Sequence, residues 1–292
     1  MRLFSLYFLF GSVFLLAQRD ATGVFSKGAY HGLMTSSTVG SLLYLHQAWY
    51  SSYFSPPLHF FNDWDEWMQM DKAGHLFTSC VLASKSSKLA SFAGYTKPQA
   101  FVWGGVYSLS YMTGLEILDG FSEGWGFSWG DYAFDLLGIS LYAASFWLDT
   151  SKAFALKFSF WPTSYAQYNP KLLGKSLPYQ VLKDYNGQTY WLTFRPAFLN
   201  GSFPRWLGIS VGYGADGMIG ASYNPETIDG KPVPYFERKR QYFFSLDIDP
   251  SQIPTKNKFL RAFLSSISVI KFPAPALEMT SKRQFFWHWL YF

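Results

Sequence analysis

The sequence predicts an α+β protein in which a membrane-associated four-helix bundle is followed by a β-rich antiparallel sheet or partial barrel. Four long helical stretches joined by short connections indicate an antiparallel bundle. After about residue 155, alternating aromatic and β-branched residues are typical of strands. Only 15% of the 292 residues are charged and 21% are aromatic, whereas about a quarter are charged in ordinary soluble domains. We therefore expect a membrane or a large partner to cover part of the surface.

The charge and the cysteine content exclude several classes of partner and site. The net charge of +5 is modest, and the longest basic run is Arg-Lys-Arg at residues 238–240. Nucleic acid is therefore not an expected partner, because phosphate binding requires a concentrated basic surface. Membrane lipid or an envelope protein complex is expected instead. The single cysteine, Cys80, excludes an internal disulfide and any metal site built from several cysteines.

Residues 1–17 resemble a secretory signal peptide. Arg2 supplies the positive charge, residues 3–16 form an apolar run of suitable length, and Ala17 offers a small residue for cleavage. A membrane anchor is the alternative, although the run is short for a span. No cysteine follows the run, so a lipoprotein anchor is not expected here. The sequence thus predicts an exported protein of the periplasm or outer membrane of a Gram-negative bacterium.

The helical bundle is expected between residues 30 and 150. Pro56-Pro57 end its first helix, Pro98 opens the third at position N1, and Ser128 is the expected N-cap of the fourth. The four helices are expected at residues 32–53, 69–93, 98–118 and 129–148. Each is long enough to cross a bilayer, yet each carries polar residues, so spanning and half-buried positions both stay open.

The β-rich region is expected over residues 155–292. Turns of the kind that connect strands are indicated by Asn186-Gly187 and by Asp229-Gly230. The four expected strands lie at residues 189–194, 206–213, 241–248 and 284–292. The aromatic C-terminal stretch is similar to the last strand of an outer-membrane barrel, but it is apolar on both faces instead of alternating.

Three further segments of this region have distinct expectations. Residues 256–266 form a short amphipathic helix. Pro273 and Pro275 exclude a central strand, because proline cannot donate to a sheet ladder. The glycine-rich segment 212–218 is expected to be a tight turn between strands and not a nucleotide-binding loop, since it lacks the required glycine order and the Walker lysine.

The helical region also contains six ionisable side chains in three pairs. The spacing of three or four residues places the two members of each pair on one helix face. The pairs are Asp71 with His75, Glu116 with Asp119, and Asp131 with Asp135. If the three helices are neighbours, the six side chains converge at one end of the bundle.

Such a cluster has two interpretations. In the structural one, the side chains pair with one another, with Lys72 and with helix N-terminal amides to lock the bundle. In the functional one, they perform acid–base catalysis or bind a divalent metal. The catalytic candidates are His75, Glu116, Asp119 and Asp131. The candidate metal ligands are Asp71, His75, Glu116 and Asp135.

A hydrolase would need a nucleophile or a cationic group that holds the substrate beside the cluster, and Lys72 is the only obvious candidate. The structural interpretation is therefore favoured. It predicts a structural or accessory envelope protein. The alternative is a metal- or acid/base-dependent hydrolase that acts on lipid or cell-wall substrates. Whether the chain is an enzyme stays open.

The motifs of the cluster resemble those of a known family. Asp71-Lys72-x-x-His75, Glu116-x-x-Asp119, Phe127-Ser128-x-x-Asp131 and a following Gly138 are similar to the YfiM-like family of predicted periplasmic lipoproteins, whose function is unknown. The glycine-rich segment 212–218 and residues 272–278 look like the tail of longer exported members. The same helical order more loosely resembles VanZ-like membrane proteins.

The resemblance covers residues 67–140 and implies an envelope location but no reaction. Two features depart from the family pattern. The family usually has asparagine at the position of Asp135, and it carries a lipoprotein cysteine that is not found after the apolar run here.

Overall fold

The computed structural model describes residues 23, 25–50, 57–150 and 153–292, which form two compact units. The helical unit contains the described residues up to 64 together with residues 72–150, and the β unit contains residues 65–71 and those from 153 onward. The predicted signal peptide lies outside the described residues. The α+β class is confirmed, because helices form the N-terminal region and an antiparallel sheet forms the C-terminal region.

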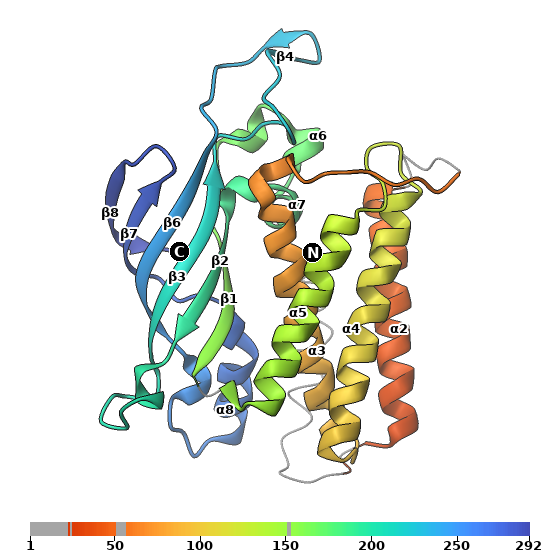
Figure 1. The fold of residues 1–292 in the computed structure, drawn as a ribbon, viewed down its shortest axis with the longest axis vertical. Helices are drawn as coiled ribbons and strands as arrows, with labels where there is room; N and C mark the ends of the chain where they lie inside the picture. The colour runs from red at the N-terminus through yellow and green to blue at the C-terminus, as the bar shows by residue number, and fades with distance from the viewer. Residues whose placement is uncertain (1–22, 24, 51–56, 151–152) are drawn as a thin grey trace. The chain divides into compact units, whose positions relative to one another are not determined.

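Four long helices make up the described N-terminal region (Figure 1). Their bounds are Lys27–Leu45 for α2, Met70–Phe92 for α3, Lys97–Gly120 for α4 and Trp129–Trp147 for α5. The last three agree with the prediction to within two residues. The first begins earlier than predicted, and after Leu45 the chain continues as a π-helical turn, His46–Tyr50. Closure into a four-helix bundle and association with a membrane stay predictions.

Side-chain caps fix where two of these helices begin. Ser128 accepts a hydrogen bond from the amide of Asp131 at 3.0 Å, which confirms it as the N-cap of α5. Thr96 and Gln99 form a capping box before α4, and Pro98 lies in the first turn of that helix. The capping groups satisfy amides that have no partner inside the helix.

Glycines bring α3 close to its two neighbours. A Cβ atom on Gly138 of α5 would lie 2.1 Å from Ser79 Oγ and 2.3 Å from the carbonyl oxygen of Leu76, both on α3. A Cβ atom on Gly104 of α4 would lie 2.5 Å from the carbonyl oxygen of Ala83. Both helices therefore pack on the backbone of α3 at distances that only glycine permits.

This packing predicts the effect of one methyl group. Gly138→Ala should destabilise the protein by about 1–3 kcal/mol, because the new methyl group meets backbone that cannot move aside. Gly105→Ala is the matched control, since a Cβ at Gly105 has nothing within 4 Å and alanine is the better helix former. Urea unfolding followed by the helical circular dichroism signal compares the two. Equal midpoints for the two variants would contradict the close packing.

The β unit is built on one six-stranded antiparallel sheet in the order β1-β2-β3-β6-β7-β8. The strands are β1 Phe154–Phe160, β2 Gln188–Phe194, β3 Leu207–Asp216, β6 Lys239–Ile248, β7 Ala274–Thr280 and β8 Phe285–Tyr291. Strands β2, β3, β6 and β8 confirm the four predicted ones, whereas β1 and β7 were not expected from the sequence. Residues 65–71 belong to this unit as well, and Trp67 and Met70 lie in its apolar core.

Shorter elements connect these strands. The predicted turn Asp229-Gly230 joins β4, Thr227–Ile228, to β5, Lys231–Pro232, and both turn residues have positive φ. The helices are α6 Pro170–Leu173, α7 Leu177–Lys183 and α8 Lys258–Ser266. The last of these confirms the predicted amphipathic helix, and Asn257 caps it.

Three expectations about this unit are wrong. Pro275 lies in β7, which has a strand on each side. The register between β7 and β8 shifts at this residue, and the pairing of β7 with β6 begins only at Ala276. The sheet therefore needs no hydrogen bond from the backbone nitrogen of the proline. Most of the segment 212–218 belongs to β3 instead of a turn, and Gly212 leaves room for the ring of Trp191, 2.6 Å from where its Cβ would lie. Asn186-Gly187 ends a 3₁₀ turn after α7 and does not link two strands.

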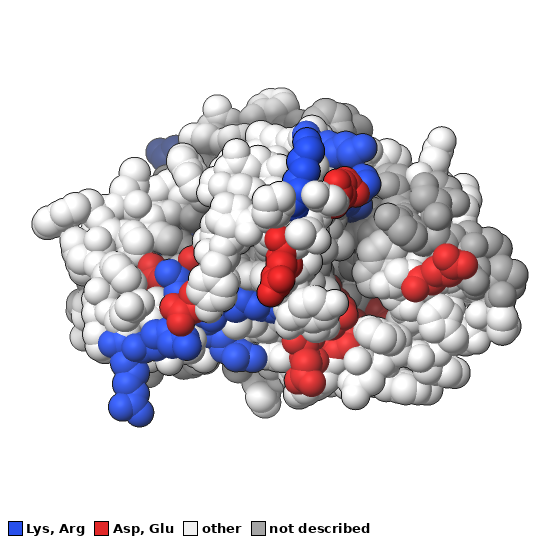
Figure 2. Space-filling view, turned by 90° about the horizontal axis from the view of Figure 1, so that it is seen from above, with Lys and Arg blue, Asp and Glu red and all other residues white. Residues whose placement is uncertain are grey.

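Uncharged residues dominate the face of the molecule in Figure 2, in keeping with the low charged fraction of the sequence. Of the helices within the described residues, none is both long enough and apolar enough to cross a membrane.

Candidate functional site

Three helices of the helical unit each contribute one buried ionisable side chain to a common point. His75 of α3, Glu116 of α4 and Asp135 of α5 have ligand atoms that all lie within 4.8 Å of one another. His75 Nδ1 lies 3.0 Å from Asp135 Oδ1 and 3.5 Å from Glu116 Oε1. Their exposed fractions are 3% for His75 and 0% for each carboxylate. The predicted convergence is thus observed for these three residues.

A second ionic group adjoins the first. Lys72 of α3, which is 1% exposed, places Nζ 2.5 Å from Asp63 Oδ1 and 3.0 Å from Asp131 Oδ1. Asp131 belongs to the first turn of α5, and one of its carboxylate oxygens lies within 4.8 Å of a ring nitrogen of His75. The two groups therefore form one continuous buried centre. We call it the charged centre; its six side chains are Asp63, Lys72, His75, Glu116, Asp131 and Asp135.

Ser128, the N-cap of α5, connects the two halves of the charged centre. Its amide donates a hydrogen bond of 3.1 Å to Glu116 Oε2, and its hydroxyl donates one of 2.6 Å to Asp63 Oδ1. The same hydroxyl accepts the amide of Asp131. One residue at a helix start thereby fixes carboxylates from two separate segments, which a free N-terminal amide and its dipole favour.

The charges of the centre do not cancel. Four carboxylates stand against Lys72 and His75, so that full ionisation would leave a buried net charge of about −2 even with a protonated imidazole. Glu116 responds most strongly: burial raises its pKa from 4.5 to about 8, although His75 opposes the change. Within the described residues, Glu116 Oε1 has no hydrogen-bond donor. A protonated Glu116 removes one of the negative charges.

Asp63 is held in the opposite state. Burial alone would raise the pKa of this carboxyl, but hydrogen bonds with Asp131, Lys72 and Ser128 outweigh burial and bring the pKa below its usual range. The centre therefore pairs an ionised carboxylate at Asp63 with a carboxyl at Glu116 that keeps its proton near neutral pH.

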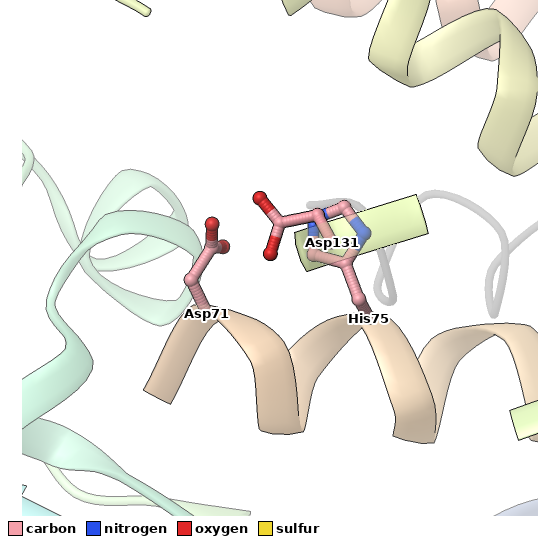
Figure 3. Close-up of side chains that lie close together, drawn as sticks. All are labelled: Asp71, His75 and Asp131. Carbon is pink, nitrogen blue, oxygen red and sulfur yellow. The ribbon is translucent and has the colours of Figure 1, made fainter. Parts of the chain in front are cut away.

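Two predicted site residues take part in other contacts. Asp71 and His75 extend from successive turns of α3 on one side of the helix, as the spacing predicts (Figure 3). Asp71 nevertheless belongs to the β unit, where it accepts a hydrogen bond from the hydroxyl of Tyr185. Asp119 accepts a hydrogen bond of 2.7 Å from the hydroxyl of Tyr50.

The sequence did not identify Asp63 as part of the site. It lies in an aromatic and acidic segment before α3, outside the three helical pairs from which the cluster is predicted. The one signal in the sequence that points to Asp63 is the predicted N-cap, Ser128. The hydroxyl of an N-cap serine accepts a hydrogen bond from the helix and can also donate one, so it can bind a carboxylate from another segment.

The spacing of the donor atoms also suits a metal ion. Two ligands bound at about 2.1 Å to one ion lie about 3.0–3.4 Å apart at octahedral or tetrahedral angles. The distances from His75 Nδ1 to Asp135 Oδ1 and Glu116 Oε1 are 3.0 and 3.5 Å. One imidazole with two carboxylates is a donor set that zinc, manganese or iron accepts.

Comparison with known proteins agrees with the sequence at family level. Residues 59–147 match the model of a family described as "Predicted periplasmic lipoprotein (DUF2279)". This segment contains α3–α5 and the whole charged centre. The description fits an exported envelope protein, while the finer likenesses to YfiM-like and VanZ-like proteins stay predictions. No curated protein and no solved structure matches the chain.

Proposed function

We propose that this chain is an exported envelope protein with a structural or accessory role, in which the charged centre holds helices α3, α4 and α5 together. Its proposed location is the periplasm at the outer membrane of a Gram-negative bacterium. The description of the matched family supports export. The contacts of the charged centre support the structural role.

One observation carries this role: the buried charges of the centre contact partners from different elements. Lys72 of α3 pairs with Asp131 of α5, and His75 of α3 contacts both Glu116 of α4 and Asp135 of α5. Removing one partner of a buried ion pair costs about 3–5 kcal/mol, because the other charge stays buried alone. The centre therefore penalises any arrangement that separates the three helices.

Truncation of Glu116 tests the structural role. Glu116→Ala should lower the free energy of unfolding by about 1–3 kcal/mol, since the Ser128 amide and the His75 ring both lose a buried partner. Glu123→Ala is the control, because Glu123 is an exposed residue of the loop before α5. Thermal melting of the purified full chain in mild detergent measures both variants. A Glu116→Ala variant that melts like wild type would contradict the structural role.

A second candidate is a metal- or acid/base-dependent hydrolase acting on lipid or cell-wall substrates. The donor spacing at His75, Glu116 and Asp135 favours it, as does the raised pKa of Glu116, which gives a carboxyl able to exchange a proton near neutral pH. In this function His75 and Glu116 act as the acid–base pair or bind the ion together with Asp135. Asp131 would orient His75.

The metal content of the purified full chain separates the two candidates. The structural proposal predicts no stoichiometric divalent metal in wild type. A metal present at one equivalent, lost in both His75→Ala and Glu116→Ala but kept in Asp119→Asn, would favour the hydrolase. Asp119 is the matched control because it is a carboxylate of the same helix whose hydrogen-bond partner is Tyr50. In that case His75→Ala and Glu116→Ala should also keep their fold while losing the hydrolase activity.

A further inference from the structure

The six-stranded sheet of the β unit has the reverse of the usual polarity. Antiparallel sheets of water-soluble proteins bury apolar side chains on one face and expose polar side chains on the other. Strand β6 instead buries Ser245 and Asp247 and exposes Phe244, Leu246 and Ile248. Strand β7 repeats the pattern by burying polar or small residues and exposing apolar ones. We call the two sides the inner and the outer face.

The inner face is close-packed and largely polar, apart from the buried rings of Trp191 and Phe243. Lys157 Nζ lies 2.5 Å from Asp247 Oδ2, with both side chains 0% exposed, and Arg195 Nε donates to Asp249 Oδ2 at 2.7 Å. One row of paired inner positions crosses all six strands as Ala155, Thr193, Ser210, Ser245, Ala276 and His288. The hydroxyls of Thr189 in β2 and Tyr291 in β8 lie 3.1 Å apart, so the sheet curls around this polar interior.

The outer face carries no charge along its central rows. One row of paired positions consists of Leu156, Leu192, Val211, Phe244, Leu277 and Trp287. The next row consists of Phe158, Tyr190, Tyr213, Tyr242, Met279 and Phe285. Tyr190 and Tyr213 pack against the apolar core that contains Trp67 and Met70, whereas the row is 40–64% exposed from Tyr242 to Phe285. From Leu192 to Trp287, the first row is 40–54% exposed. Water would have to cover a continuous apolar surface across five strands, which is unfavourable.

Charged and aromatic groups are found at the ends of the sheet. At one end, ion pairs join Lys239 to Asp216 and Lys282 to Glu237. At the other end, the amphipathic helix α8 exposes Phe259 and Phe263. The loop before β3 adjoins this second end and exposes four apolar side chains, namely Phe198, Leu199, Phe203 and Trp206.

The second end also contains an open cleft. Arg205 and Arg261 line it together with Trp206 and Ile253. Basic and aromatic side chains at the edge of an apolar band are typical of the level of lipid headgroups. An exposed amphipathic helix beside them fits the same level.

We propose that the outer face of this sheet contacts the acyl chains of a lipid bilayer, and that Arg205, Arg261 and the exposed aromatic residues beside them lie among anionic headgroups. The proposal rests on the envelope location proposed above and is independent of the charged centre. A second copy of the chain fits less well, because protein interfaces carry about one hydrogen bond per 100–200 Å² and the central outer row offers no polar side chain. The sheet has buried charges on its inner face and exposed apolar side chains on its outer face. This is the arrangement expected of a sheet whose outer face contacts lipid instead of water.

Spin labels on the outer face test the proposal. The labels are placed singly by Val211→Cys, Phe244→Cys or Leu277→Cys in a Cys80→Ser background. The full chain is reconstituted in vesicles of phosphatidylethanolamine and phosphatidylglycerol. Tyr235→Cys is the control, because Tyr235 is an exposed apolar residue of the same unit outside the sheet. Collision rates with oxygen, which dissolves in acyl chains, and with a nickel chelate, which stays in water, are compared.

The outer-face labels should collide several-fold more often with oxygen than with nickel, and the label at Tyr235 should show the reverse. Nickel collisions at all three outer positions equal to those at Tyr235 would overturn the proposal. Protection from both reagents would also overturn it and would indicate a protein contact. Three separate positions guard against one variant that fails to fold.

The headgroup contact is tested with the Arg205→Ala/Arg261→Ala double variant. Its flotation with phosphatidylglycerol vesicles should fall several-fold, and its flotation with pure phosphatidylcholine vesicles should match wild type. Unchanged flotation with the anionic vesicles would overturn the role of the two arginines. Glu116→Ala melting reports on the charged centre alone, so failure of either proposal is distinguishable from failure of the other.

Discussion

Lys72→Met should lower the free energy of unfolding by about 3–5 kcal/mol, the cost of leaving a buried charge without its partner. Methionine keeps most of the length and volume of lysine, so the loss reports on charge and not on a cavity. The substitution leaves Asp63 and Asp131, which lie 2.5 and 3.0 Å from the ammonium group, facing each other without the cation between them. Chemical denaturation followed by the helical circular dichroism signal measures the effect.

The matched control is Lys171→Met. Lys171 Nζ lies 2.8 Å from Asp229, as close as the Lys72 pair, but both side chains are more than 60% exposed. An exposed pair contributes about 0–1 kcal/mol, so this variant should unfold almost like wild type. Adding Asp131→Asn to Lys72→Met should recover part of the loss, because it removes one of the stranded charges. Equal effects of Lys72→Met and Lys171→Met would mean that burial does not strengthen the centre.

The helical half of the fold could be predicted because its determinants are local. Ser128 caps α5 through a contact three residues away, and Pro98 fits the first turn of α4. The same locality predicted that Asp71 and His75 share a face. What it could not predict is the choice of partner, since Asp131 and Asp135 share a helix but contact Lys72 and His75 respectively. That choice depends on how three helices pack, which is set by close contacts such as the one at Gly138.

The β half was harder because periodicity does not say which face is buried. Alternation in β6 predicted a strand correctly, yet Asp247 is inside and Phe244 is outside. Pro275 predicts that no central strand forms there, but the register shift beside it makes its missing amide harmless. Asp63 could not be predicted for a similar reason. It lies in a loop, where no periodic pattern indicates which way a side chain points, so only the folded structure shows its contact with Lys72.

The stability of the protein should fall with rising pH through Glu116. Burial raises the pKa of this carboxyl from 4.5 to about 8, so the folded state holds a proton that the unfolded state releases. The resulting stabilisation is fully present below pH 4.5 and is lost by the time the pH exceeds about 8. The slope between these limits is at most about 1.4 kcal/mol per pH unit for one group. Glu116→Gln has no proton to release, so it should lose this dependence.

The measurement is the difference in unfolding free energy between wild type and Glu116→Gln at several pH values from 5 to 8.5, with a chelator present. The difference should move in favour of the glutamine variant as the pH rises. The difference cancels every titration that the substitution leaves unchanged, so it reports on Glu116 together with the groups that contact it. Glu123→Gln, a substitution of an exposed glutamate in the same unit, should show a difference from wild type that stays constant. If Glu116→Gln also gave a constant difference, Glu116 would be ionised in the folded protein. A cationic side chain would then have to balance it, and repeating the series without chelator would show whether a metal ion changes that balance, as the metal-dependent form of the hydrolase requires.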